Sequence, residues 1–462
     1  MSGREGNPAF AITKAAVRGP HMLALAMLML TIAGAAVRWG SVGDVPESAL
    51  GPFMLGWLLL SGWVAGRLAE CASLPRVTGY LLVGLAAGPG LAALAHFPVT
   101  ILDDRALSSV ALVDDAAIAL IGLLAGSELR ASVLRPHLHV SLRLVGWQLA
   151  LLAPAGAAAL FAVAIAAPAG WHLEGSLQPG LILGSLAAGM VLVANSPAIV
   201  VAVVRELGAR GIVARTALAT TILKDLVLTV AFTAVLGGAV ALGPGSTEGA
   251  GLVEGMATVA THLVGSLLAG AIVGPMLAWL AARTPIRDDA LAGLSAVVIV
   301  AVAIHFDLSI LLTSLAAGIA AANFPRLDAA RLTHATDTYL VPVLCVAFPI
   351  IGARLDLGAA LALAPVALGL ALMRAGGLWL ACRAALPATR APSPSLRANA
   401  WMAFLPQAAV AIALLADFES QLGGHPWARS MHAMLLGMVV FNALLGPAFL
   451  RLALRRDEST LP

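Results

Sequence analysis

The chain has 462 residues, of which 60% are hydrophobic and 11% charged, and its mean hydropathy is +0.95. Soluble domains are about half apolar and about a quarter charged, so this composition excludes a soluble globular protein and indicates a polytopic membrane protein. The net charge of +3 comes from arginines scattered through loops, which does not fit the dense basic patch of a nucleic-acid-binding protein.

A membrane-spanning helix needs about 20 mainly apolar residues. On this basis the sequence predicts an all-α fold of about fourteen spanning helices. The predicted segments are 21–37, 50–69, 77–95, 110–129, 140–167, 179–204, 212–241, 252–282, 289–305, 307–324, 338–355, 357–382, 397–417 and 431–454.

The distribution of basic residues supports this helix count, because lysine and arginine favour cytoplasmic loops. With the N-terminus placed inside, 21 of the 27 Lys and Arg residues fall in cytoplasmic segments. Lys224 and Arg374 lie inside predicted helices. The outer segments hold Arg38, Arg105, Arg354 and Arg429. This asymmetry predicts that both termini are cytoplasmic.

The first apolar segment has two interpretations that stay open. Lys14 and Arg18 precede it, and small residues follow at 33–36, a pattern that secretory signal peptides share. Cleavage would leave one helix fewer and an outer N-terminus; retention gives the topology described above.

Two predicted helices carry polar interruptions where a break is expected. Asn195-Ser196-Pro197 interrupts the segment 179–204, and Pro406-Gln407 interrupts 397–417. Proline removes a backbone donor and disfavours the helical conformation of the residue before it. Transporters often combine such broken helices with inverted repeats. The two interruptions lie seven predicted helices apart, which favours two inverted repeats over two unrelated kinks. The predicted organisation is an N-terminal tail with an extra transmembrane helix (1–48), a first repeat (49–241), a linker and helix (242–287), a second repeat (288–455) and a short cytoplasmic tail (456–462).

Lys224 and Asp225 are neighbours inside the apolar stretch ATTILKDLVLTVAFTAVL. A charge near mid-membrane costs about 3 kcal/mol on insertion scales, so ionisable groups there usually mark an ion or proton path. The alternative role for Asp225 is a structural salt bridge with Lys224 or Arg374.

Several segments together resemble the cation/proton antiporter superfamily, which includes sodium/proton exchangers and potassium-efflux systems. The similar segments, which run in order from about residue 50 to 455, are LPRVTGYLLVGLAAGPGL, AIALIGLLAGSELR, ANSPAIVVAVVRELGARG, TALATTILKDLVLTVAF, LTSLAAGIAAANF, PIIGARLDL and ALMRAGGLWLACRAAL.

The resemblance implies roles for particular residues. Asp225 would be the essential carboxylate that binds either a proton or, transiently, an alkali metal cation. Arg374 would be the charge-compensating partner. The resemblance also implies a homodimer, with a dimer-forming panel and a core bundle that moves against it. The broken-helix crossing would be formed by Asn195, Ser196, Pro197, Pro406 and Gln407.

Lys224 departs from the family pattern, in which Asp, Asn or Gln usually precedes the essential aspartate. An ammonium at this position repels a bound cation. Two roles for Lys224 stay open: a titrating proton carrier or a permanently charged counter-ion. Asn195 and Ser196 either supply oxygen ligands to a cation or only satisfy backbone groups freed by Pro197. Arg374 is either a functional or a purely structural fixed charge.

Other polar residues have simpler interpretations. Asp114 and Asp115 begin a predicted helix, where acidic residues favour capping; an outer vestibule is the alternative. Glu128 beside Arg130 is predicted to be an interfacial pair. His305 and Asp307 are predicted to be interfacial, and interfacial anchors are predicted at Trp39, Trp171 and Trp427.

The sequence therefore predicts an Na⁺ or K⁺/proton antiporter of a bacterial inner membrane that works by alternating access. The alternatives are a transporter of another, anionic solute on the same fold, and a transport-inactive sensor or subunit. No enzyme activity and no cofactor are predicted. Cys71, Cys345 and Cys382 are widely separated and form neither a metal-binding pattern nor a disulfide framework.

Overall fold

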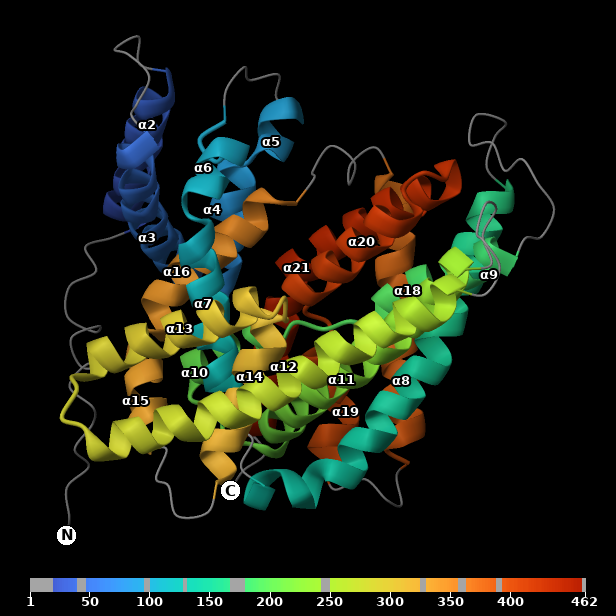
Figure 1. The fold of residues 1–462 in the computed structure, drawn as a ribbon. Helices are drawn as coiled ribbons and strands as arrows, with labels where there is room; N and C mark the ends of the chain where they lie inside the picture. Colours follow the sequence, from blue (N-terminus) through green and yellow to red (C-terminus); the bar gives the residue numbers. More distant parts are fainter. Residues whose placement is uncertain are drawn as a thin grey trace.

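The computed structural model describes residues 20–39, 47–94, 100–127, 131–166, 179–241, 250–324, 330–355, 363–387 and 393–458. Every regular element within these ranges is helical, which confirms the predicted all-α class. The helices form two bundles that pack against each other (Figure 1).

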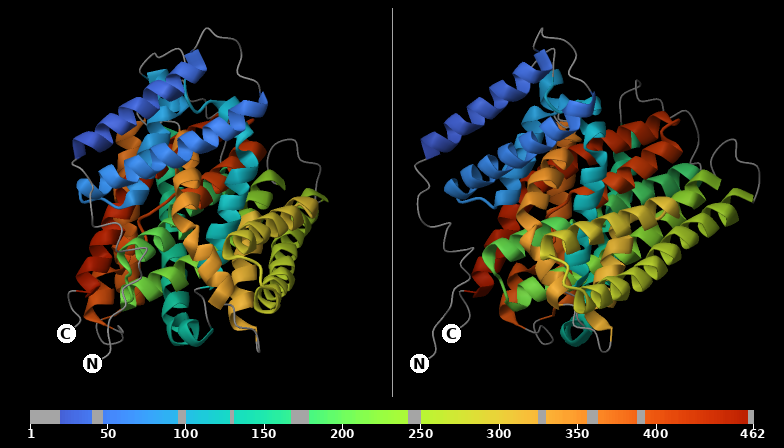
Figure 2. Two further views of the ribbon diagram at one scale, coloured as in Figure 1. Left: turned by 90° about the vertical axis from the view of Figure 1, so that its left-hand side faces the viewer. Right: turned by 60° about the vertical axis from the view of Figure 1, so that its left-hand side comes forward.

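The first bundle is built around three central helices, α7, α14 and α16, and α2 (Pro20–Trp39) packs on its outside against α3. Figure 2 shows α2 and α3 along one edge of the molecule and α12 and α13 along another. The bundle contains α3 (Glu47–Cys71), α4 (Arg76–Ala87), α5 (Pro89–Leu94), α6 (Asp104–Ser109), α7 (Ala111–Ser127), α12 (Ala250–Arg283), α13 (Asp288–His305), α14 (Ile310–Asn323), α15 (Ala330–Thr338) and α16 (Leu340–Ala353).

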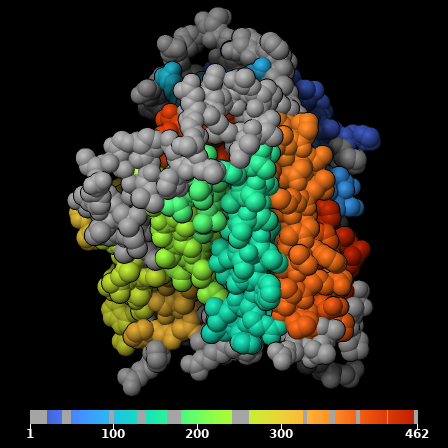
Figure 3. All heavy atoms as spheres, turned by 90° about the vertical axis from the view of Figure 1, so that its right-hand side faces the viewer, coloured from blue at the N-terminus to red at the C-terminus, as the bar shows by residue number. Residues whose placement is uncertain are grey.

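The second bundle contains both of the predicted helix interruptions. Its outer face is visible in Figure 3, where α8 runs between α11 and α18. The bundle contains α8 (Ala131–Ala166), α9 (Pro179–Met190), the 3₁₀ turn η2 (Val191–Val193), α10 (Pro197–Leu207), α11 (Ile212–Ala241), α18 (Ala364–Ala385), α19 (Pro394–Ala403), α20 (Ala409–Leu422) and α21 (Pro426–Glu458).

Each predicted segment coincides with one helix or with a pair of helices separated by a short break. Among the described residues, length and hydropathy alone mark eight helices as able to cross a membrane, or nine if the bent pair α15–α16 is one span. Helices α2, α4 and α14 are apolar but shorter. A multi-pass membrane protein is thus established, whereas the count of about fourteen spans and the inverted repeats stay predictions.

One predicted helix, 77–95, is wrong as a single element. Helix α4 ends at Ala87, Gly88 is extended (φ −83°, ψ 171°) and α5 starts at Pro89. The cause is local, because a proline disfavours the helical conformation of the residue before it. A second difference is the helix α15, which precedes the predicted segment 338–355 and meets α16 at a 55° bend at the start of that segment.

Small residues let α14 approach its neighbours closely. A Cβ atom added at Gly318 of α14 would collide with the backbone of α7 at Leu123 O, and one added at Gly274 of α12 would collide with Ala317 of α14. Gly122 and Gly126 of α7 repeat the four-residue spacing of Gly270 and Gly274 in α12. Small residues at this spacing are typical of closely packed membrane helices.

We predict opposite effects for two glycine-to-alanine changes. Gly318→Ala should lower the thermal stability of the detergent-solubilised protein, because overpacking against a rigid backbone costs about 1–3 kcal/mol. Gly369→Ala in α18, where an added Cβ meets no atom within 4 Å, should raise it, since alanine is favoured over glycine in helices by about 0.5–1 kcal/mol. Shifts of the same sign in both unfolding temperatures would contradict this packing.

Candidate functional site

The first broken helix runs from α9 through η2 to α10, and its break is buried. Ala194 and Ser196 leave the helical conformation (φ −55°, ψ 141° and φ −114°, ψ 104°), and Pro197 is the first residue of α10. Ser196 is the N-cap, and its Oγ accepts a hydrogen bond from Ile199 N (3.3 Å). The prediction of a break at this position is confirmed, and its cause is the proline that starts α10.

The second broken helix runs from α19 to α20, and its break lies directly against the first. Ser196 N donates to Pro406 O (3.1 Å). Gln407 Nε2 donates to Val191 O (2.8 Å), and Gln407 Oε1 accepts from Asn442 Nδ2 of α21 (2.9 Å). Both breaks predicted from the sequence are therefore present, and they cross.

Arg374 of α18 is fully buried and joins the two breaks. Its guanidinium lies at the end of η2 and at the end of α19, where carbonyl groups lack helical partners and carry partial negative charge. Asn195 Oδ1 is a further acceptor, at 3.3 Å from Nη2. The carbonyl acceptors are Leu192 O (2.7 Å), Ala194 O (2.8 Å), Phe404 O (2.9 Å) and Leu405 O (2.8 Å).

Lys224 of α11 is also fully buried, and it points at the same crossing. Its Nζ donates to Asn195 Oδ1 (2.5 Å) and to Gln148 Oε1 of α8 (2.8 Å), and lies 5.1 Å from the centre of the Phe404 ring. Asn195 Oδ1 thus accepts from both Lys224 and Arg374, which fixes the orientation of this amide. Its Nδ2 faces Thr221 Oγ1 at 3.5 Å.

Asp225 is 4% exposed, so its carboxylate faces the protein interior in this conformation. Its Oδ1 is buried and has no hydrogen-bond partner. The side chain lies one helical turn beyond Thr221, on the face of α11 that meets Asn195. Asp225 forms no salt bridge with Lys224 or Arg374 in this conformation, because both cations bind neutral oxygens. The alternative structural role of Asp225 is therefore not seen here.

The geometry of the crossing shows what its polar side chains bind in this conformation. The Ser196 side chain caps α10 and the Gln407 side chain donates to the backbone carbonyl of Val191, so both bind the backbone in this conformation. Asn195 Oδ1 is occupied by the protein's own cations. Pro197 and Pro406 mark the breaks themselves.

Two buried amides at the site, Gln148 and Asn442, are not among the residues predicted from the sequence. Gln148 lies in the apolar run VGWQLALLA of α8, and Asn442 in GMVVFNALLG of α21. The available signal was a polar side chain inside a membrane-spanning helix, but an uncharged amide is a weaker marker than a charge.

Several other predicted residues lie elsewhere. Asp114 lies in the first turn of α7, where the predicted capping role requires it, and its Oδ2 also pairs with Arg354 next to the end of α16 (3.0 Å). His305 and Asp307 lie at the α13–α14 turn, where Asp307 is almost fully exposed and has φ +52°, as expected for interfacial residues. Trp427 is half-buried and stacks on His425. The predictions for Glu128 and for the Trp39 and Trp171 side chains fall outside the described residues.

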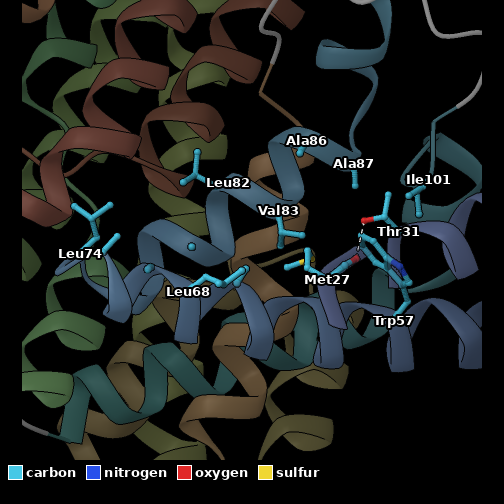
Figure 4. Close-up of a pocket in the computed structure, with 14 residues that line it drawn as sticks. Met27, Thr31, Trp57, Leu68, Leu74, Leu82, Val83, Ala86, Ala87 and Ile101 are labelled. Atoms are coloured by element: carbon cyan, nitrogen blue, oxygen red, sulfur yellow. Dashed lines mark hydrogen bonds between the residues drawn. The ribbon is translucent and has the colours of Figure 1, made fainter. Parts of the chain in front are cut away.

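An apolar cavity of about 380 Å³ lies away from the crossing, between α2, α3 and α4 (Figure 4). Met27, Trp57 and Leu82 are among its lining residues, and none of the predicted site residues is. In the described part of the chain, no three His, Cys, Asp or Glu side chains are grouped to hold a metal ion.

Two membrane helices that break where they cross, with buried charged side chains at the breaks, define a secondary transporter of ions. The chain belongs to the sodium/hydrogen exchanger family: the family described as sodium/hydrogen exchanger, transmembrane, matches residues 53–456. This confirms the resemblance found in the sequence motifs and makes the protein a sodium/proton exchange type of secondary transporter.

Solved structures show the same fold. A structure of the sodium proton antiporter MjNhaP1 from Methanocaldococcus jannaschii at pH 8 is similar with 16% identity and a TM-score of 0.61, over 89% of this chain and 99% of that chain. An electron-microscopy structure of MjNhaP1 gives 16% identity and a TM-score of 0.64, over 88% and 97% of the two chains. No curated protein matches the chain.

We predict that Arg374→Met strongly destabilises the protein. Removing the guanidinium leaves buried carbonyl groups of both breaks without a donor, and each buried acceptor left unsatisfied costs about 1–3 kcal/mol. Arg383→Met is the matched control on the same helix, because Arg383 is exposed and its guanidinium lies over the Trp379 ring (4.8 Å). Thermal unfolding in detergent measures both; equal losses would show that Arg374 does not hold the crossing together.

Proposed function

We propose that the protein exchanges Na⁺ for H⁺ across the membrane by alternating access, with Asp225 as the shared binding group. The observation that carries this proposal is the buried Asp225 Oδ1, which has no hydrogen-bond partner. An ionised carboxylate without a partner is costly in a membrane interior. A proton or a small cation removes that cost, and the two exclude each other because both need the same oxygen atoms.

The charges around the crossing support a simple transport cycle. Lys224 and Arg374 remain bound to neutral oxygens while Asp225 is loaded with either ion. A site that carries either a proton or a sodium ion has the same charge in both loaded states. Exchange then proceeds one for one, and movement of the second bundle against the first exposes Asp225 to each side in turn.

Finer features remain part of this proposal. Na⁺ and K⁺ both prefer hard oxygen ligands, so K⁺ is a second candidate substrate.

We further propose a homodimer in a bacterial inner membrane, with both termini cytoplasmic and with the repeats 49–241 and 288–455 forming the two halves. The arginine-rich cytoplasmic segments are the basis for this orientation.

The proposal predicts that Asp225→Asn abolishes exchange. An amide neither releases a proton at ordinary pH nor supplies a negative charge. Proteoliposomes with a pH-sensitive dye inside and the membrane potential held constant should show proton flux on addition of NaCl, and none above protein-free liposomes for Asp225→Asn. Separate additions of KCl, LiCl and choline chloride identify the cation.

Asp417→Asn is the control for this experiment, because Asp417 is an exposed carboxylate of α20. Its flux should equal that of the native protein. Full sodium-dependent flux in Asp225→Asn would contradict the proposal, and flux driven only by KCl would change the assigned cation.

Competition at one carboxylate also predicts a bell-shaped pH dependence of sodium uptake. At low pH the proton occupies Asp225 and excludes sodium; at high pH protons are too scarce to complete the cycle. Raising the sodium concentration should extend activity to lower pH, which isotope uptake into proteoliposomes measures. An acid limb that does not move with sodium concentration would rule out competition at a shared site.

A further inference from the structure

Gln148 has a buried side chain in the middle of α8, beside the exposed Trp147, and its Oε1 accepts a hydrogen bond from Lys224 Nζ (2.8 Å). The other polar acceptor of this amine is Asn195 Oδ1. The amine also lies over the Phe404 ring. These groups come from three separate elements: α8, the first break and the second break.

The groups in the described residues that bind the amine are all uncharged. Amide oxygens and an aromatic face stabilise an ammonium group without neutralising it. Asp225, the adjacent residue, supplies no ligand to the amine, and its Oδ1 has no partner. The lysine is thus held at the crossing while the carboxylate beside it stays free.

Asn195 alone would bind the Lys224 amine less well than Asn195 and Gln148 together, because Asn195 Oδ1 is already shared with Arg374 Nη2 (3.3 Å). Gln148 is the acceptor that binds the amine without a second cation on the same oxygen. Without Gln148, the amine keeps only the shared Asn195 oxygen among its two amide acceptors, and the carboxylate of the adjacent Asp225 becomes a competing charged acceptor, which an ion pair would block.

We propose that Gln148 is a positioning residue that keeps the Lys224 amine away from Asp225 and thereby keeps the carboxylate available to sodium and protons. This inference rests on the proposed function of Asp225. It explains how a lysine beside the binding aspartate is compatible with cation exchange: the amine is bound elsewhere and competes with the transported ion only when that acceptor is lost.

The transport test uses Gln148→Met, which keeps the side-chain length and removes the acceptor. Loss of a hydrogen bond to a charged group should raise the KM for sodium about tenfold, with a smaller change in kcat. Gln148→Glu keeps an acceptor oxygen and should not raise the KM. Ser141→Ala removes a buried hydroxyl of α8 that accepts a hydrogen bond from Thr220 Oγ1, and is the matched control.

A double-mutant cycle with Lys224→Met shows whether Gln148 acts through the amine. In the Lys224→Met background, Gln148→Met should change the KM for sodium by no more than about twofold. The same tenfold rise in both backgrounds, or an equal rise in Gln148→Met and Gln148→Glu, would overturn the inference.

Thermal unfolding tests the same point without transport. In the native background Asp225→Asn should raise the unfolding temperature, because it removes an unpaired buried charge. In Gln148→Met it should lower that temperature, because it removes the new Lys224–Asp225 ion pair. Equal shifts in both backgrounds would overturn the role of Gln148, whereas failure of the native protein to exchange ions would refute only the proposed function.

Discussion

Breaking a membrane helix leaves backbone carbonyl groups without partners, and in lipid each such group costs several kcal/mol. Here the Arg374 guanidinium donates to carbonyl oxygens of both breaks at once. Its planar fork of donors suits this arrangement in a way that a lysine ammonium does not. The guanidinium therefore links the two breaks, and their crossing places Asn195 between Arg374 and Lys224, the residue next to Asp225 in the sequence of α11.

This arrangement separates the structural charge from the functional one. Arg374 is bound to backbone groups that have fixed positions, so its charge stays at the crossing. Lys224 is bound by side-chain amides and an aromatic ring instead of backbone groups. Asp225 has the least compensation of the three. In a transporter that alternates between conformations, the group with unsatisfied binding capacity is the one that responds to ions.

Much of this fold could be predicted from the sequence because membrane burial imposes strong patterns. Apolar length located the helices, and prolines located both breaks at Pro197 and Pro406. Side-chain partners were less predictable, since they depend on which helices meet. The Lys224–Gln148 contact joins residues 76 positions apart, and Asp114 pairs with Arg354 across two helices. The break at Gly88 was missed although Pro89 carries the same signal as Pro197, because no polar residues accompany it.

Equilibrium binding tests the central claim, that sodium and a proton occupy the same carboxylate, more directly than transport does. The detergent-solubilised protein, kept in a weakly buffered solution near the acid limb of its activity, is titrated with NaCl while released protons are measured. If Asp225 is the shared group, sodium binding releases up to about one proton per ion bound, and Asp225→Asn releases none. Sodium binding without proton release, or undiminished release from Asp225→Asn, would contradict the account.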